Sequence, residues 1–565
     1  MTLVPLITDI AMKAGCTDRA KCEAVLADAV AKRISLVEAL LDSELVEEVL
    51  FAKTLAATTG LDFQEESELD LTSPLHNRFP AKIALRHRLL PASIDGKNMC
   101  LMTYDPFDLE AKQSVGRDLQ KDVTWVVSTR YQIMEGLRIG YGVGAEHFDE
   151  LIEGRDQSAN DDDLAQEVTQ LDEDDEEASV MNFVNQIFRE ALRERATDIH
   201  LEPLEKNLRI RYRVDGALQS VTVPPEIRAL QNSLISRLKI MAQLDIAERR
   251  LPQDGRINLE LDGEPIDVRV ATIPSVNGES VALRLLTRQQ FDMSMLGLDA
   301  QSEATIKELL GKPNGIILVT GPTGSGKSTT LYTFLKELNT VDTRIVSIED
   351  PVENKLDGVI QIAVKPEIGL TFAGGLRSIL RGDPNIIMVG EMRDLETTEI
   401  AIRGALTGHL VFSTLHTNDA VAGISRLLDM GVEPFLIASS VQAFIAQRLV
   451  RKLCEHCAVP DDSLDDSYLQ SIGFPLENKH LILEAKGCRA CRDTGYRGRL
   501  AIVEICLMNG ALQELVTANA NYHQLRDQAS INGMITLRNY GWQKVSEGIT
   551  TIAEVLTNTA AAGDA

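Results

Sequence analysis

The residues most clearly suited to carrying out chemistry form a glycine-rich segment at 321–329. An apolar stretch at 316–319 comes directly before it and a helical pattern follows it, which is the setting of a Walker A phosphate loop. Glycines let successive backbone N–H groups face a phosphate, and the helix adds its positive end. We expect Lys327 to contact the β- and γ-phosphates of ATP and Ser328 to bind Mg²⁺. The predicted nucleotide-binding residues of this segment are Gly321, Pro322, Thr323, Gly324, Ser325, Gly326, Lys327, Ser328 and Thr329.

Acidic residues follow two further apolar stretches of the chain, RIVSI and NIIMV. The first stretch leads into Glu349, Asp350 and Glu353, and the second leads into Gly390 and Glu391. Open α/β sheets bind their ligands at the carboxyl ends of the strands, so these acids are expected beside the phosphate loop. ATP hydrolysis needs an acid near the metal and a group that orients or deprotonates water. The acids of these two segments are the candidates.

Four of the eight cysteines form two C-x-x-C pairs, Cys454 with Cys457 and Cys488 with Cys491. Two such pairs can complete a tetrahedral structural zinc site, and the long gap between them indicates an inserted subdomain. His456 is an alternative ligand, although four thiolates already fill the coordination shell. Disulfide bonds are the competing interpretation, and a reducing cytosol disfavours them. A site closed by four thiolates has no open position for water, so this zinc is expected to be structural.

The elements that must position these groups are those of a multidomain α/β protein. A chain of 565 residues is too long for one hydrophobic core. From residue 297 onward helices alternate with apolar strands, which predicts a parallel sheet and a RecA-like P-loop NTPase motor domain. The predicted parts are an amino-terminal α/β domain at 1–145, an acidic flexible linker at 146–178, a second α/β domain at 179–290, the P-loop motor domain at 291–450, a zinc module at 451–505 and a helical region at 506–565.

The charge balance bears on the partners of the chain. There are 57 basic and 84 acidic residues, which gives a net charge of −27. A motor that moves along nucleic acid needs a basic track, so nucleic acid is an unlikely cargo, and a DNA-translocating ring would require a local basic pore. No apolar run approaches the roughly 18 residues that span a bilayer, and the first residues do not resemble a secretory signal. We therefore expect a cytoplasmic protein that meets the membrane only through partners.

Several segments of the chain closely resemble the bacterial type II secretion and type IV pilus assembly ATPases. The segments that carry this resemblance span about 180 to 558 and include GPTGSGKSTTLY, SIEDPVE, LRSILRGDPNIIMVGEMRD, TGHLVFSTLHTND, DIHLEP, RIRYRVDG and RLPQDGRI. The resemblance implies a homohexameric motor that hydrolyses ATP, with nucleotide bound between the second α/β domain and the motor domain. Secretion is slightly favoured over pilus extension. The zinc module indicates an assembly motor, because retraction motors of the family lack it.

The resemblance also implies roles for individual residues. Glu353 corresponds to the glutamate that activates water, and Glu391 to the acid that supports Mg²⁺. His409 and His416 lie in the histidine box, where a γ-phosphate-sensing or interface role is expected. Arginines in the family's motifs contact phosphate or a neighbouring subunit, and guanidinium groups suit that task. The arginines that match these stretches are Arg213, Arg269, Arg284, Arg377 and Arg381.

The amino-terminal domain matches the family only loosely. In the family such domains bind an inner-membrane platform protein and its cytoplasmic adaptor, and some bind cyclic di-GMP. The dinucleotide-binding version resembles an arginine-leucine-glycine motif, whereas here Arg33 and Ile34 are followed by Ser35. We therefore favour protein docking over dinucleotide binding. A nucleotide-binding scaffold without turnover is the rival function for the whole chain.

Overall fold

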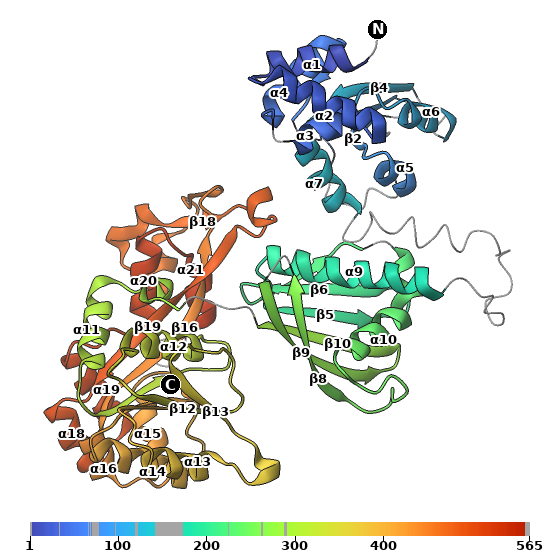
Figure 1. Cartoon of the computed structure of the whole chain (residues 1–565). Coiled ribbons are helices and arrows are strands. Elements are labelled where there is room, and N and C mark those ends of the chain that lie inside the picture. Colours follow the sequence, from blue (N-terminus) through green and yellow to red (C-terminus); the bar gives the residue numbers. More distant parts are fainter. Residues whose placement is uncertain are drawn as a thin grey trace. The chain divides into compact units, whose positions relative to one another are not determined.

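The computed structural model describes residues 3–141 and 173–559, with gaps at 33, 44, 66, 68, 70–77, 96–97, 119–121, 224, 262–263 and 287–290. It divides into two compact units, Met1–Leu285 and Leu286–Ala565 (Figure 1). Most of the predicted acidic linker, 146–172, lies outside the described residues. The last residues assigned to it, 173–178, belong instead to helix α9, Glu173–Arg193. Within the described residues, no helix is long and apolar enough to cross a membrane.

The amino-terminal part of the first unit combines helices with a four-stranded sheet in the order β1-β4-β3-β2. A single apolar core joins its helices and strands, as predicted for an α/β domain. Ser35 caps α3: its side-chain oxygen accepts a hydrogen bond from the N–H of Glu38 and donates one to Asp105 at 2.7 Å. The elements are α1 Leu3–Lys13, α2 Arg19–Lys32, α3 Leu36–Asp42, α4 Glu48–Thr59, β1 Asp62–Phe63, α5 Ala81–Arg86, β2 Leu90–Asp95, β3 Asn98–Thr103, α6 Leu109–Asp118, β4 Asp122–Val127 and α7 Arg130–Tyr141.

The rest of the first unit has its own six-stranded sheet, in the order β7-β6-β5-β10-β9-β8. Except in β7, buried side chains alternate along the strands and pack into the core with α9 and α10, while the side chains between them form a polar face. This open face carries Arg209, Arg211, Arg213, Arg256, Arg269 and Arg284. The elements after α9 are β5 Asp198–Pro203, β6 Leu208–Val214, β7 Ala217–Val221, α10 Gln231–Met241, β8 Gln253–Leu261, β9 Glu264–Ser275 and β10 Gly278–Leu286.

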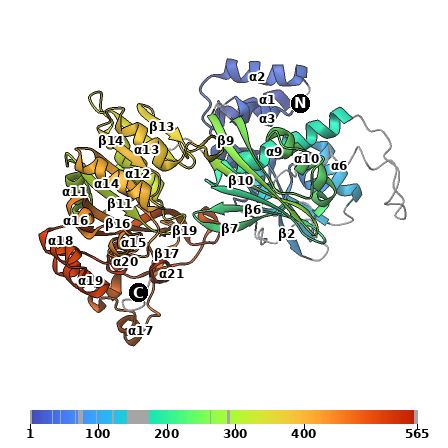
Figure 2. The ribbon, with the colours of Figure 1, turned by 90° about the horizontal axis from the view of Figure 1, so that it is seen from below.

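The second unit is built on a seven-stranded sheet in the order β13-β12-β14-β15-β11-β16-β19. Six strands are parallel, and β19 at one edge is antiparallel to β16. Figure 2 shows helices α12, α13 and α14 grouped around β11 and β14. The strands are β11 Gly315–Thr320, β12 Ile345–Glu349, β13 Val359–Ala363, β14 Ile386–Val389, β15 Leu410–Leu415, β16 Val441–Leu453 and β19 Tyr496–Leu507. The helices that pack with them are α11 Ala300–Leu310, α12 Lys327–Leu338, α13 Phe372–Leu380, α14 Leu395–Leu406, α15 Ala422–Asp429 and α16 Pro434–Ser440.

Two predicted boundaries in this unit fall inside strands. The motor domain was expected to end at 450, but β16 continues to Leu453, and β19 runs past the expected boundary at 505. The cysteine-bearing segment is thus an insertion between two paired strands of the motor sheet. Trp542 and Val555 of the carboxyl-terminal helices share a small apolar core with this insertion. The remaining elements are β17 Ala458–Pro460, α17 Asp466–Ser471, β18 Leu483–Ala485, α18 Gly510–Thr517, α19 Tyr522–Ile531, α20 Leu537–Ser546 and α21 Ile552–Asn558.

Candidate nucleotide-binding site

The phosphate loop lies between the buried strand β11 and helix α12, as predicted. Gly321, Gly324 and Gly326 have φ values of 152°, 81° and 87°, which side chains other than glycine rarely adopt. A Cβ atom at Gly321 would also lie 2.5 Å from the hydroxyl oxygen of Ser325. The sequence therefore needs glycine at these positions to shape the loop, and α12 directs its amino terminus toward the loop.

Lys327 occupies the first position of α12 and is only 9% exposed. Its ammonium donates hydrogen bonds to the carbonyl oxygens of Gly321 at 2.8 Å and Pro322 at 3.0 Å. Burial lowers the pKa of Lys327, and the carboxylates of Glu391 and Glu353 oppose that shift. The parallel pairing brings the carboxyl ends of β11, β12 and β14 to one edge of the sheet, and Lys327, Glu353 and Glu391 follow these three strands.

Three hydroxyl groups near the phosphate loop are buried without a hydrogen-bond partner among the described residues. They belong to Thr320 at the end of β11, Ser325 in the loop and Ser413 on the neighbouring strand β15. Buried polar groups normally find partners, and oxygen-rich ligands such as phosphates satisfy hydroxyl donors. Ser325, which lies in the loop itself, fits a nucleotide phosphate together with the loop N–H groups and Lys327, and Ser328 at the start of α12 fits the hard-cation chemistry of Mg²⁺.

The acids after β12 have different environments. Glu349 is buried, and its carboxylate accepts hydrogen bonds from the hydroxyls of Tyr332 and Ser347 and from the side-chain amide of Gln361. It is therefore a structural acid and is not available to the reaction. Tyr332 in turn accepts a hydrogen bond from the backbone N–H of Glu353 at 3.2 Å. Burial, together with the Glu349 carboxylate, raises the pKa of Tyr332, so its hydroxyl stays protonated.

The side chain of Glu353 is exposed, so it can reach a water molecule, while its backbone is held by Tyr332. Sequence reasoning did not single out Tyr332. Its position is an ordinary buried site on α12, five residues after Lys327, and only the fold brings it to the loop that follows β12. The signal that could have identified it is a tyrosine within an otherwise apolar helix face, because a buried phenol needs a polar partner.

Glu391 lies at the carboxyl end of β14 with two basic neighbours. Its carboxylate pairs with the guanidinium of Arg393 at 2.6 Å and lies 3.5 Å from Nε2 of His416. The carboxylate raises the pKa of Arg393. His416 follows β15, whose carboxyl end lies beside that of β11. The structure thus places Glu391 and His416 side by side at the edge that carries the phosphate loop.

His409 lies at the other end of the same strand. It precedes β15, and its carbonyl oxygen accepts a hydrogen bond from the N–H of Gly315 at the start of β11. Its ring contacts the carbonyl oxygen of Gly404 at 2.8 Å. A strand rises about 3.3 Å per residue, so His409 and His416 are separated by roughly 20 Å. The γ-phosphate-sensing role predicted for His409 does not fit this position; an interface role stays a prediction.

The predicted arginines of the second unit are exposed on α13 and at its end. Arg377 forms an ion pair with Glu396, and Arg381 donates a hydrogen bond to Ser378 at 3.2 Å. Among the described residues, neither forms a hydrogen bond or ion pair with the phosphate loop. Their exposure is compatible with contacts to a second subunit, which stays a prediction.

The predicted arginines of the first unit share the open face of its sheet. Arg213 and Arg284 flank Asp198 from the two neighbouring strands, at 3.5 and 2.9 Å. Arg269 lies opposite Arg256 in the pairing of β9 with β8. This face therefore concentrates guanidinium groups, most of which pair with acids of the same sheet: Arg209 and Arg211 with Glu202, Arg213 and Arg284 with Asp198, and Arg256 with Asp267.

The four predicted zinc ligands converge. The sulfur atoms of Cys454, Cys457, Cys488 and Cys491 lie within 4.8 Å of one another, with separations of 3.9 Å between Cys454 and Cys488 and 3.7 Å between Cys457 and Cys491. Tetrahedral zinc with bonds of about 2.3 Å to sulfur needs sulfur atoms about 3.8 Å apart. The separations are far too long for disulfide bonds. The geometry therefore fits a Cys₄ zinc site.

Backbone groups complete this cluster. The N–H groups of Cys488 and Gly495 each donate to the sulfur of Cys491 at 3.2 Å. Burial acts to raise the pKa of the Cys491 thiol, but these backbone hydrogen bonds, together with hydrogen bonds from the Cys457 and Cys488 thiols, lower the pKa to about 7. Since metals bind the thiolate form, these hydrogen bonds favour at Cys491 the state that a zinc ion requires.

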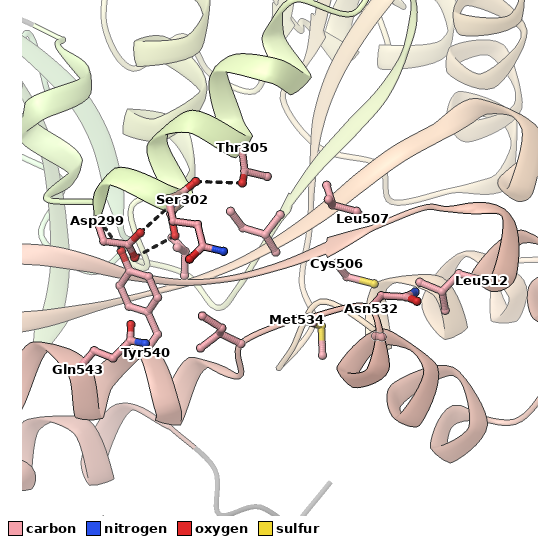
Figure 3. Close-up of a pocket in the computed structure, with 16 residues that line it drawn as sticks. Asp299, Ser302, Thr305, Cys506, Leu507, Leu512, Asn532, Met534, Tyr540 and Gln543 are labelled. Atoms are coloured by element: carbon pink, nitrogen blue, oxygen red, sulfur yellow. Dashed lines mark hydrogen bonds between the residues drawn. The ribbon is translucent and has the colours of Figure 1, made fainter. Parts of the chain in front are cut away.

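A cavity of about 380 Å³ lies elsewhere in the second unit (Figure 3). Asp299 and Ser302 at the start of α11, Cys506 and Leu507 of β19, and Tyr540 of α20 are among its lining residues. Strand β16 separates β19 from β11, so this cavity is distinct from the phosphate loop and plays no part in the nucleotide site.

The second unit has the architecture of a P-loop nucleotide-binding ATPase. A largely parallel sheet presents a glycine loop and a buried lysine after β11 and two acids after β12 and β14, all at the edge formed by the carboxyl ends of the strands, where this class binds nucleotide. The chain belongs to the family described as type II/IV secretion system protein, whose profile matches residues 173–557. A profile described as MshEN domain matches residues 59–146.

Known proteins similar to this chain include ATPases of type IV pilus assembly and of type II secretion. The type IV pilus assembly ATPase PilB of Myxococcus xanthus (strain DK1622) is 41% identical over 92% of this chain and 93% of its own length. The type II secretion system ATPase E of Vibrio cholerae is 43% identical over 85% of this chain and 96% of its own length. The X-ray structure of the Yersinia pseudotuberculosis ATPase DotB matches with a TM-score of 0.50 at 19% identity, covering 70% of this chain and 96% of that one, which supports the fold alone.

Proposed function

We propose that this chain hydrolyses ATP to ADP and phosphate and thereby powers protein export by a type II secretion system. Its family and relatives make it an ATPase motor for secretion or pilus assembly. The observation that supports the reaction is the position of Lys327, Glu353 and Glu391 after strands β11, β12 and β14, whose carboxyl ends lie at one edge of the sheet. A scaffold without turnover has no need for an exposed acid whose backbone is held in place beside a phosphate loop.

Each residue has one task in the proposed reaction. The loop N–H groups and the Lys327 ammonium bind the phosphates of ATP and stabilise the charge that builds up on them. Ser328 and Glu391 would hold Mg²⁺, which supplies further charge neutralisation when bound. Glu353 accepts the proton of the attacking water as general base. His416, beside Glu391, can respond to charge at the metal site.

The proposed working form is a homohexamer in which each nucleotide lies between a motor domain and the arginine-rich sheet face of a second α/β domain. Arg213, Arg269 and Arg284 supply cationic groups on that face, and Arg377 and Arg381 are exposed on the motor. Guanidinium groups from two elements would then close around the phosphates. The predicted amino-terminal domain docks on an inner-membrane platform protein and its cytoplasmic adaptor. This would place the motor in the cytoplasm, peripheral to that membrane.

Pilus extension is the second candidate function. The similarity to the Myxococcus xanthus PilB over nearly the whole of both chains favours it. Deleting the gene separates the two: loss of a secreted protein with surface pili intact supports secretion, and loss of pili with secretion intact supports extension.

The reaction itself is tested by phosphate release from the purified full chain with Mg²⁺ and ATP. We expect turnover by the wild type and none above background by a Lys327→Ala variant. Native mass measured in the same samples with and without nucleotide tests the hexamer. If the wild type binds ATP but releases no phosphate, even with phospholipid and at high protein concentration, the scaffold function replaces the motor.

A further inference from the structure

A buried glutamine on β16 connects the phosphate loop to the first turn of α12. Gln447 is 1% exposed. Its side-chain amide nitrogen donates to the carbonyl oxygen of Ser325 at 2.9 Å, and its amide oxygen accepts from the hydroxyl of Thr330 at 2.7 Å. A backbone carbonyl can only accept, so this partner fixes which end of the amide faces the loop. Both the donor and the acceptor group of this side chain thus form hydrogen bonds within the nucleotide site.

The loop also packs directly on this residue. A Cβ atom at Gly321 would lie 2.7 Å from the backbone oxygen of Gln447, and one at Gly326 would lie 2.8 Å from its side-chain nitrogen. Contacts this short do not occur at real Cβ atoms. At both ends of the loop, glycine is required partly because Gln447 occupies the adjacent space. Gly324, in contrast, has open space around it and needs glycine only for its backbone angle.

The bond to Ser325 determines the direction of the next N–H group. In a planar trans peptide, the carbonyl oxygen of one residue and the N–H of the following residue point in opposite directions. When Gln447 holds the carbonyl of Ser325 toward β16, the N–H of Gly326 is turned away from β16. In a phosphate loop, N–H groups must face the bound phosphates. The glutamine therefore holds one peptide unit in the orientation that phosphate binding requires.

We propose that Gln447 is a positioning residue for nucleotide binding, which orients the peptide between Ser325 and Gly326 and fixes the loop to α12 through Thr330. This inference rests on the proposed function, since it presumes that the loop binds nucleotide. Gln447 touches no reacting atom. Its removal should weaken the binding of both ADP and ATP, with a smaller effect on turnover at saturating ATP.

The test is the dissociation constant of ADP, measured by isothermal titration on the full chain. Gln447→Met preserves the approximate length of the side chain and removes both hydrogen bonds. We expect it to weaken ADP binding about tenfold, in line with the loss of buried hydrogen bonds. Thr330→Val should weaken binding by about threefold, and Thr330→Ser, which keeps the hydroxyl, should restore it. In turnover assays, Gln447→Met should raise KM more than it lowers kcat.

Thr333→Val is the matched control. Thr333 is also buried on α12, but its hydroxyl bonds to the carbonyl of Thr329 in the same helix and does not reach β16. The ADP affinity of the Thr333→Val variant should stay within about twofold of that of the wild type. Since Thr330 acts through the glutamine, adding Thr330→Val to Gln447→Met should cause little further loss.

Three results would overturn the inference while leaving the proposed function intact. They are wild-type ADP affinity in Gln447→Met, an equal loss in Thr333→Val, and fully additive losses in the double variant. If the wild type itself fails to bind ADP, the proposed function and this inference fall together. If the wild type binds ADP and any of the three results is observed, only the positioning role of Gln447 is refuted.

Discussion

The phosphate loop and the acids opposite it lie at the same sheet edge but are held in different ways. The loop is shaped by its own glycines and by two side chains that bond to its backbone, Gln447 and Lys327. The acids depend on side chains from several elements: Tyr332 of α12 holds the backbone of Glu353, and Arg393 and His416 pair with Glu391. We call the phosphate loop with Lys327 the binding half of the site, and Glu353 and Glu391 with their partners the chemical half. Different substitutions should therefore damage nucleotide binding and hydrolysis separately.

The largest expected effect comes from Lys327→Ala, which removes the one buried ammonium from the binding half. Because this cation stabilises charge on the phosphates, we expect turnover to fall on the order of 10²–10³-fold and ATP binding to weaken with it. Phosphate release and ATP titration on the same samples measure both. Lys336→Ala, an exposed lysine of the same helix, is the control and should behave as the wild type. Intact turnover in Lys327→Ala would remove the phosphate loop from the reaction.

A smaller effect is expected from Tyr332→Phe, which acts on the chemical half alone. The change removes the hydroxyl that holds the Glu353 backbone, so kcat should fall by roughly tenfold, less than the about 100-fold that a 1 Å misplacement can cost. The ADP dissociation constant should stay within about twofold. Tyr540→Phe is a matched control, because Tyr540 is also buried and also accepts a backbone N–H, from Asp299. Weaker ADP binding in Tyr332→Phe would mean that the two halves are not separable.

The smallest effect on turnover is expected in the cysteine insertion, which lies outside both halves. Cys491→Ser should lose bound zinc and lower Tm by at least about 4 °C, because a structural metal contributes its binding energy to folding. Turnover at a temperature well below Tm should change less than about threefold. The measurements are zinc content and thermal unfolding. The control is Cys506→Ser, which replaces a buried cysteine outside the cluster. Loss of turnover in a folded, zinc-free variant would extend the nucleotide site to this insertion.

Features encoded by contiguous residues were predictable from the sequence. The glycine loop with Lys327, the acids after β12 and β14, and the two cysteine pairs each form local motifs, and a parallel sheet brings the carboxyl ends of its strands to one edge. The fold class followed from the alternation of helices and apolar strands. The predicted motor domain ended within β16 and left out β19, because the cysteine insertion separates these two strands of one antiparallel pair.

Features that depend on long-range packing were not predictable. Gln447 is 122 residues from Ser325 along the chain, and no local pattern marks it as a neighbour of the loop. His409 and His416 share one motif, and only the direction of β15 separates the first from the phosphate edge. Glu349 and Glu353 are equally acidic in sequence, but burial with three donors makes the first a structural residue. In each case tertiary contacts decide the role.

The most direct test of the account is ATP binding and turnover by Glu353→Gln. The substitution keeps the size of the side chain and removes its ability to accept a proton, a contribution typically of 10²–10⁴-fold. The account predicts that phosphate release falls at least about 100-fold while ATP and ADP affinities stay within about twofold of the wild type. Wild-type turnover in this variant would contradict the assignment of Glu353 as the base. An equal loss of binding would contradict the separation of the two halves.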